Sequence, residues 1–366
     1  MTSRLLSRLE AAIASTIDLR ERDCLRAERA AYLVRLGRAN DAQGEIDSLQ
    51  AGSSSGPVAV VVAWTKFAAG MQDHYAGNDA EALDKWKRAK ALTTAIAERR
   101  LFRLTCAWLA YLHYTRADMA STINFLAEAL AEPGEICHAT AARAALIVAQ
   151  LYHVTRDFDA ASPWYTKTRH HAAMDGDDVM ISTLIHNMAW VRAFNVRQTI
   201  LSRLAVASPA SLRFDAESTR NFDQLIGLTS LSSLHPLLQA QVSLLEDRYE
   251  EALRLLDEHT EASRKQGFSR MQSSFLADRA FCKAKLGLLS DAEVDAKAAQ
   301  ENLAADVQPD DLAATHSRLA LVYSAVGSHE LAKHHQSLAD GLWGDFEKFQ
   351  QRLSDDLKAV PVLRTA

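Results

Sequence analysis

The chain has 366 residues, a formal net charge of −5 at pH 7, four cysteines and 48% hydrophobic residues. The slight acidic balance argues against nucleic acid as a direct partner, because proteins that bind it carry a basic face that neutralises phosphates. No cysteine pair has CxxC spacing, and no segment approaches the ~20 apolar residues of a membrane span. The N-terminus also lacks an apolar run long enough for a secretory signal. We therefore expect a cytoplasmic protein without a membrane partner.

The chain begins with a predicted amphipathic helix and continues as helical hairpins. Over residues 3–17, apolar side chains share one face at helical spacing, and this helix is expected to cover the edge of the first hairpin. The stripe consists of Leu6, Leu9, Ile13 and Ile17. An alanine-rich composition with 14 glycines favours helix in the rest of the chain. Turn-forming residues predict loops between hairpins at 51–57, 131–135, 171–178 and 306–311.

The hairpins are predicted from pairs of small residues twelve positions apart, with a turn between them. The second residue of each pair recurs at steps of 40, 40, 39, 41, 50, 40 and 40 residues: Ala42, Ala82, Thr122, Ala161, Ser202, Ala252, Ala292 and Ala332. The first residue follows the same period: Ala30, Gly70, Ala110, Ala149, Ala189 or Trp190, Ala240, Ala280 and Ala320. Two antiparallel helices pack closely only where their side chains are small at the crossing. Such a period is typical of stacked helical repeats.

The one long step, between Ser202 and Ala252, indicates a structural discontinuity. We expect residues 1–205 to hold an N-terminal capping helix and hairpins one to five. Residues 206–235 are predicted to be an irregular insertion, and residues 236–366 to hold hairpins six to eight and a C-terminal capping helix, all in one continuous solenoid. Pro236 is expected to open a helix, because proline is tolerated in a first helical turn. The capping helix is predicted from an apolar stripe in the tail: Leu342, Phe346, Phe349, Leu353 and Leu357.

The small pairs, the glycine-type turns and the recurring large side chains, such as Trp86 and Tyr165, resemble the tetratricopeptide repeat family over residues 20–340. The period exceeds the usual 34 residues, and this 40-residue variant is similar to the helical sensor region of MalT-like bacterial regulators. HEAT repeats share the period, but their first-helix proline and charged ladder are missing. The length is also similar to that of Rap-type quorum sensors, without a matching motif. The resemblance implies an all-α, right-handed superhelix of about eight hairpins.

On the tetratricopeptide pattern, positions one and four after the first small residue face the concave groove of the superhelix. In the middle of the array these positions, with Arg143 earlier on the same face, hold aromatic and hydrogen-bonding side chains. The candidate ligand-binding residues are His74, Tyr111, Tyr114, Arg143, Gln150, His153 and Phe194. The tyrosines offer stacking faces, and Arg143 offers a fork for a carboxylate. The same residues could instead be core between hairpins, each histidine being satisfied by a neighbour.

No sequence motif supports catalysis, a cofactor or a metal. The chain has no GxxxxGK[ST], GxSxG, GxGxxG or HExxH pattern, and its adjacent histidine pairs point in different directions on a helix. The most basic stretch, 84–90, is interpreted as a solvated outer face. We therefore expect a non-enzymatic scaffold or regulatory module that binds a protein or peptide in its groove. The alternative is a sensor of a small molecule or signal peptide that acts on a transcription or signalling partner.

Overall fold

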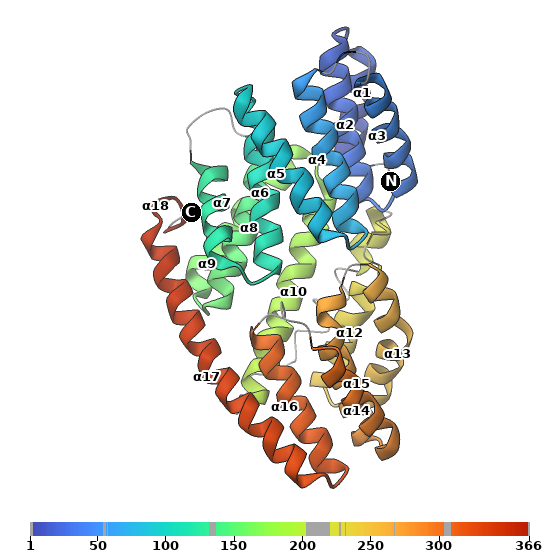
Figure 1. Cartoon of the computed structure of the whole chain (residues 1–366), viewed down its shortest axis with the longest axis vertical. Helices are drawn as coiled ribbons and strands as arrows, with labels where there is room; N and C mark the ends of the chain where they lie inside the picture. The colour runs from blue at the N-terminus through green and yellow to red at the C-terminus, as the bar shows by residue number, and fades with distance from the viewer. Residues whose placement is uncertain are drawn as a thin grey trace. The chain divides into compact units, whose positions relative to one another are not determined.

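The structure is a computed structural model that describes residues 3–53, 56, 58–131, 137–202, 220–226, 228–230, 232–266, 268–303 and 309–364. Within these ranges the chain is helical and contains no strand (Figure 1). The described helices therefore confirm the all-α repeat architecture. Two compact units are present. Unit 1 comprises Met1–Leu184, Phe222–Leu231 and Ser354–Ala366, and unit 2 comprises Ile185–Asn221 and Ser232–Leu353.

Unit 1 contains four helical hairpins preceded by one helix. The helices are α1 (Arg4–Ser15), α2 (Leu19–Arg35), α3 (Ala39–Ser53), α4 (Ala59–Tyr75), α5 (Asp79–Ala95), α6 (Arg99–Thr115), α7 (Met119–Leu130), α8 (His138–Val154), α9 (Phe158–Asp175) and the short α18 (Pro361–Arg364). Within each hairpin the first helix packs on the second: α2 on α3, α4 on α5, α6 on α7 and α8 on α9. Helix α10 (Asp178–Leu201) starts in this unit and ends in unit 2.

Unit 2 contains three further hairpins of the same kind. Its helices are α12 (Leu234–Leu245), α13 (Tyr249–Lys265), the 3-10 helix η1 (Ser269–Met271), α14 (Gln272–Lys285), α15 (Leu289–Glu301), α16 (Pro309–Ala325) and α17 (His329–Ala359), whose residues from Ser354 onward belong to unit 1. Helix α12 packs on α13, and α14 on α15. The Trp343 indole of α17 donates to the Ser317 hydroxyl of α16 over 3.0 Å, which joins the last pair. Pro236 lies in the first turn of α12, as predicted.

The small residues lie at the helix crossings, as their spacing predicts. Ala82 and Ala292 are fully buried, and both members of most other pairs are buried as well. Gly70 shows the reason most directly, because a Cβ at this position would lie 2.7 Å from the Trp86 indole and 3.3 Å from the Ala82 carbonyl oxygen. Trp86 in turn donates from its indole nitrogen to the Phe67 carbonyl oxygen over 3.1 Å. The close approach of the two helices at Gly70 thus fixes the position of the buried Trp86 ring as well as that of the two helix backbones.

Seven residues after the first small residue, each complete hairpin has a residue with positive φ. The seven positions are Gly37, Gly77, Ala117, Arg156, Asp247, Gly287 and Gly327, with φ between 58° and 87°. The turn is of the Schellman type, in which two backbone N–H groups close the end of the first helix. In the second hairpin, Asn78 donates to Asp73 over 2.8 Å and Gly77 donates to His74 over 3.0 Å. This turn explains why the hairpins share one period.

The fifth repeat departs from this pattern. The equivalent position is Val196 or Arg197, but α10 continues through both residues to Leu201 without a turn. A β-branched side chain is strongly disfavoured at positive φ, so valine at this position favours a continuous helix. Residues 203–219, where the second helix of this repeat would fall, lie outside the described residues. About half of the insertion predicted for 206–235 lies there too, and the predicted division at 205/206 stays a prediction.

Several predicted boundaries differ from the structure. Helix α3 runs to Ser53, inside the predicted loop at 51–57, and α16 begins at Pro309, inside the predicted loop at 306–311. Helix α1 ends at Ser15, and Ile17 is 94% exposed, so it does not belong to the apolar stripe. The predicted loop at 171–178 is helical up to Asp175, and Gly176 and Asp177 alone connect α9 to α10. The tail is no separate helix, because α17, the second helix of the eighth hairpin, runs on through it and has 31 residues in all. Its predicted apolar stripe still packs inward, with Phe346, Leu353 and Leu357 buried.

The short segment 228–230 of unit 1 covers the carboxyl end of α2. Ser230 donates from its hydroxyl to the Arg35 carbonyl oxygen over 2.6 Å, and Thr229 donates to the Leu36 carbonyl oxygen over 3.2 Å. Helix ends leave such carbonyl groups without partners inside the helix. A Cβ on Gly37 would collide with this segment, at 2.3 Å from the Thr229 hydroxyl oxygen. Glycine is therefore required there by both conformation and space.

Candidate functional site

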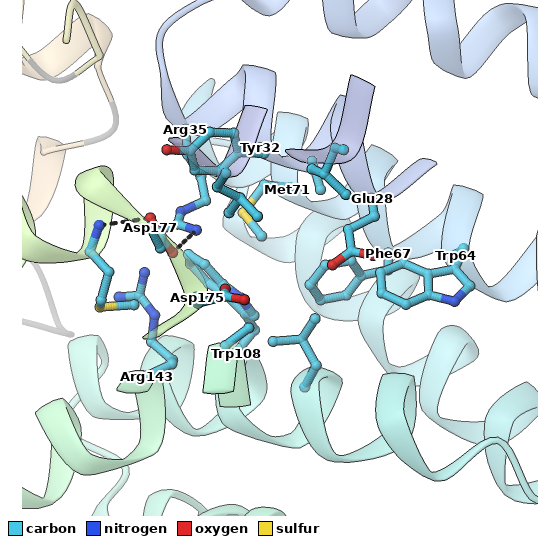
Figure 2. Close-up of a pocket in the computed structure, with 16 residues that line it drawn as sticks. Glu28, Tyr32, Arg35, Trp64, Phe67, Met71, Trp108, Arg143, Asp175 and Asp177 are labelled. Atoms are coloured by element: carbon cyan, nitrogen blue, oxygen red, sulfur yellow. Dashed lines mark hydrogen bonds and ion pairs between the residues drawn. The ribbon is translucent and has the colours of Figure 1, made fainter. Parts of the chain in front are cut away.

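Unit 1 contains a cavity of about 40 Å³ on the side of its first helices, closed in part by α1. This volume accommodates about three water molecules at roughly 10–15 Å³ each. Its aromatic and apolar wall includes Tyr32, Trp64, Phe67, Met71 and Trp108 (Figure 2). Its five charged lining residues are Glu28, Arg35, Arg143, Asp175 and Asp177. These residues come from α2, α4, α6, α8, the end of α9 and the turn before α10, so the fold brings four hairpins together here.

A buried bidentate ion pair lies at one side of the cavity. The two terminal nitrogens of Arg35 donate to the two carboxylate oxygens of Asp177 over 2.7 and 3.1 Å. The same carboxylate accepts the Met180 backbone N–H over 2.9 Å, so it also caps the first turn of α10. Burial opposes the charge of Arg35, but Asp177 outweighs it and raises the pKa of Arg35 above its ordinary value. Arg35 therefore stays protonated at neutral pH.

Arg143, from α8, is the second cation of the cavity and differs from Arg35 in having no hydrogen-bonding or ionic partner among the described residues. Its side chain is 3% exposed, and it makes no hydrogen bond or ion pair with any residue in the described part of the chain. Its guanidinium carbon lies 4.0 Å from the ring centroid of Trp108 and 5.2 Å from that of Tyr111. Burial first, and then the nearby Arg35, lower the pKa of Arg143 to about 10. Arg143 is therefore still protonated at neutral pH, in a place that penalises its charge.

Each acidic side chain of the cavity already has an arginine of its own. Glu28 pairs with Arg100, and Asp175 accepts from Arg8 over 2.7 Å. Asp177 pairs with Arg35, as described above. When these partner arginines are included in the count, one positive charge, that of Arg143, has no compensating negative charge among the described residues. Buried charges are normally paired or hydrogen-bonded, so an unpaired one calls for an explanation, and a bound anionic group is one that the cavity can supply.

Two more candidate residues from the sequence lie beside Arg143. Tyr111 is half-buried, and its ring packs on Trp108 with centroids 5.7 Å apart. His74 packs edge-on against Tyr111 at 5.5 Å, and its Nδ1 lies 2.7 Å from a carboxylate oxygen of Asp79. The structure thus brings His74, Tyr111 and Arg143 into one cluster. Of the three, Arg143 alone lines the cavity.

The remaining candidates from α6 and α8 do not line the cavity. Tyr114 is half-buried, and Gln150 is buried, with its side-chain oxygen lacking a hydrogen-bond partner among the described residues. His153 packs on Phe158, and its Nδ1 lies 3.0 Å from the hydroxyl of Tyr165 in α9. His153 therefore has the neighbour within its own hairpin that the core interpretation describes. Nothing in the geometry tests a binding role for these three residues.

Phe194 belongs to unit 2 and has a different environment. The Arg197 guanidinium carbon lies 3.9 Å from its ring centroid, and Arg197 donates to Asp311 over 2.6 Å. In the same unit, Arg318 donates to Asp278 over 3.0 Å. The buried arginines here have carboxylate partners, in contrast to Arg143. Arg197 and Arg318 thus show the same stacking on an aromatic ring, together with the carboxylate pairing that Arg35 has and Arg143 lacks within the described residues.

Sequence reasoning missed Trp108, Arg35 and Asp177. Trp108 lies two positions before the small residue Ala110, whereas the groove positions of the repeat pattern come after it. Asp177 lies in a stretch whose composition predicts a loop, and Arg35 lies in the last turn of α2. Trp64 occupies the same position in its hairpin as Arg143 does in its own, and both residues line the cavity. The repeat pattern therefore marks this position as one that faces the cavity.

Other kinds of site find no support in the described residues. No group of three or more histidine, cysteine or acidic side chains there is arranged to hold a metal ion. No helix there is long and apolar enough to cross a membrane. The four cysteines are free. In the basic stretch, Lys85, Arg88 and Lys90 pair with Asp73, Asp84 and Glu128, which agrees with a solvated outer face.

Comparison with known proteins gives a fold likeness. No protein-family model and no curated protein matches the sequence. Among solved structures, the chain is similar to a Rap protein crystallised in complex with Competence and Sporulation Factor, with a TM-score of 0.56 and 11% sequence identity. The match covers 96% of this chain and 92% of the Rap chain. At this identity the likeness shows the fold alone, a tetratricopeptide-like helical repeat along nearly the whole chain.

Proposed function

We propose that this protein is a non-enzymatic binding module that holds a peptide or protein segment against the first helices of unit 1. The carrying observation is the buried Arg143, which lines a partly open cavity without a partner among the described residues. An unpaired buried charge lowers stability, and residues that do so are often kept for binding. The surrounding aromatic rings provide the contact area and stacking faces that recognition sites use.

The fold likeness supports the same proposal. The Rap structure is a complex with Competence and Sporulation Factor, so a chain of this architecture can hold such a ligand. By analogy with MalT-like regulators, the partner is proposed to belong to a regulatory pathway in the bacterial cytoplasm. Four free cysteines are consistent with such a reducing compartment.

A capture experiment with a matched variant tests this proposal. The tagged full-length chain and its Tyr111→Ala, Arg143→Ala double variant are incubated with extract of the native organism, and bound material is identified by mass spectrometry. The wild-type chain is expected to retain a peptide or protein that the folded double variant loses. An Arg88→Ala variant, altered on the outer face, serves as the control and should retain it. Equal capture by all three chains would contradict binding at this wall.

The second candidate is a sensor of a small molecule or signal peptide. It is favoured by the small size of the cavity, which fits part of a small ligand better than a broad protein surface. A sensor gains thermal stability from one ligand, because binding to the folded state alone stabilises it. A thermal-shift screen of metabolites and short peptides distinguishes the two functions. A scaffold should respond to none of the small molecules.

A further inference from the structure

We propose that the unit 1 cavity binds a single carboxylate group, held by Arg143, while the rest of the ligand stays outside the cavity. This inference rests on the binding function proposed above and specifies the chemistry that the site recognises. Three observations carry it: a guanidinium without a partner in the described part of the chain, the charge balance of the lining and the volume of the cavity. Each is independent of the fold likeness.

The hydrogen-bonding groups of the cavity match a carboxylate. The Nε atoms of Arg143 and Arg35 are both buried and have no acceptor among the described residues. Figure 2 shows the two side chains approaching from α8 and α2 on either side of Asp177. A guanidinium binds a carboxylate through two parallel N–H groups, so Arg143 can accept one as a fork. The Trp108 ring, 4.0 Å from the guanidinium carbon, favours a fixed plane for that fork.

The charge balance indicates a monoanion. Glu28, Asp175 and Asp177 line the same cavity, and each is paired with an arginine. One bound carboxylate would neutralise the remaining charge of Arg143. A phosphate dianion would bring a second negative charge close to three carboxylates, which repel it. The site is therefore expected to prefer a carboxylate over phosphate.

The volume limits what enters. About 40 Å³ is room for about three water molecules, which is comparable to the three heavy atoms of a carboxylate group. A whole amino-acid side chain does not fit beside it. The carboxylate can be the end of a peptide chain or the side chain of an acidic residue, and the experiment separates these sources.

Thermal unfolding with small probes tests the inference. The full chain is heated at pH 7 with 50 mM N-acetyl-glycyl-glycine, its C-terminal amide, N-acetyl-aspartyl amide or inorganic phosphate, all adjusted to one ionic strength with sodium chloride. At least one carboxylate probe is expected to raise Tm by 2 °C or more, while the amide and phosphate do not. A response to the first probe identifies a chain terminus, and a response to the third an acidic side chain.

Two variants at one position separate binding from folding. Arg143→Met is expected to lose the response, and Arg143→Lys, which keeps the charge but not the fork, to weaken the affinity at least tenfold. Arg38→Met, altered at an exposed arginine, should respond like the wild type. No shift with either carboxylate, an equal shift with phosphate, or an unchanged response in Arg143→Met would each overturn the inference.

The outcome is distinguishable from a failure of the proposed function. If native partners are captured equally by the wild type and Arg143→Met, peptide or protein binding stands and the carboxylate site is wrong. If the carboxylate response depends on Arg143 but no peptide or protein is captured, the site stands and the scaffold function is wrong.

Discussion

At the scale of single residues, two buried arginines in one cavity have opposite effects on stability. Arg35 is matched by Asp177 in a bidentate pair, whereas Arg143 has no partner within the described residues. Removing one member of a buried pair leaves the other as an uncompensated charge, which is costly. Removing a buried charge that has no partner relieves a cost instead. Replacing the arginine with an uncharged residue is therefore expected to lower the stability at position 35 and to raise it at position 143.

We predict that Arg35→Met lowers the free energy of unfolding by about 3–5 kcal/mol, because Asp177 is left buried and unpaired. Arg143→Met is expected to raise it by about 1–3 kcal/mol in the free protein. Urea unfolding followed by circular dichroism at pH 7 measures both changes, with the exposed Arg38→Met as the control. A loss of stability in Arg143→Met would show that Arg143 stabilises the fold, and would contradict a role in ligand binding as the reason for its burial.

The small residues at the helix crossings give a second prediction at this scale. Ala82 and Ala292 have no exposed surface, so a larger side chain must push two helices apart. Replacing either with leucine is expected to cost about 1–3 kcal/mol. The matched control is Glu81→Leu, on an exposed position of the same helix as Ala82. Equal urea midpoints for the Glu81 and Ala82 variants would contradict the assigned register.

At the scale of elements, the hairpin turn requires positive φ, whatever residue occupies it. Gly287 has φ +79°, and a Cβ added to it would meet no atom within 4 Å, so a side chain there meets strain but no collision. Ala117 has φ +58° and already bears a side chain. In this region L-residues other than glycine, asparagine and aspartate are disfavoured by roughly 1–2 kcal/mol.

Gly287→Ala is therefore expected to destabilise the chain by about 1 kcal/mol, and Ala117→Gly to stabilise it by a similar or smaller amount. A general preference for alanine in helices would predict that Gly287→Ala stabilises the chain and that Ala117→Gly destabilises it, which is the opposite of both expected results. Differential scanning calorimetry of both variants beside the wild type tests this. Parallel shifts in the same direction would refute the turn geometry as the cause.

The elements were more predictable from the sequence than the site was. The small pairs and turns are local requirements, so Ala82, Gly77 and the period identify the hairpins without a structure. The cavity depends on residues from four hairpins, and Asp177 has no local feature that marks it as a partner of Arg35. Arg143 was predictable because the residue pattern places it on the first-helix face. The pattern could not predict that the described residues around Arg143 include no partner for its charge.

At the scale of the whole molecule, buried histidines are concentrated in unit 2. Burial is the main factor that lowers the pKa of His186, His235 and His335, each to about 4, and neighbouring histidines or Arg220 add to the effect. His335 also lies 2.8 Å from His316 between their Nδ1 atoms and stacks on Tyr323. The folded state thus holds these imidazoles neutral, while the unfolded chain protonates them near pH 6.5.

Stability is therefore expected to fall as the pH drops from 6.5 toward 4. In this window the unfolded state binds more protons, and a histidine such as His186, whose pKa burial lowers to about 4, contributes a loss of about 2 kcal/mol by pH 5. Asp310 works in the opposite direction, because burial and the adjacent Asp311 raise its pKa to about 7. The three histidines are expected to outweigh it.

Calorimetry at pH 7, 6 and 5 measures this decline, and His186→Asn should make it shallower. Stability that is constant or rising toward pH 5 would contradict the neutral state of these histidines. The exposed His329→Asn variant is the control and should follow the wild-type profile.

The recurring turn also bears on how the gene can change. Consecutive left-handed turn residues stand 39 or 40 positions apart, from Gly37 to Arg156 and again from Asp247 to Gly327. An in-frame loss or duplication of one such segment by recombination joins one turn to another of the same kind, with both flanking helices in register. The chain can therefore lengthen or shorten by whole hairpins without a new loop having to evolve. Selection on such a gene acts on the number and order of hairpins as well as on single codons.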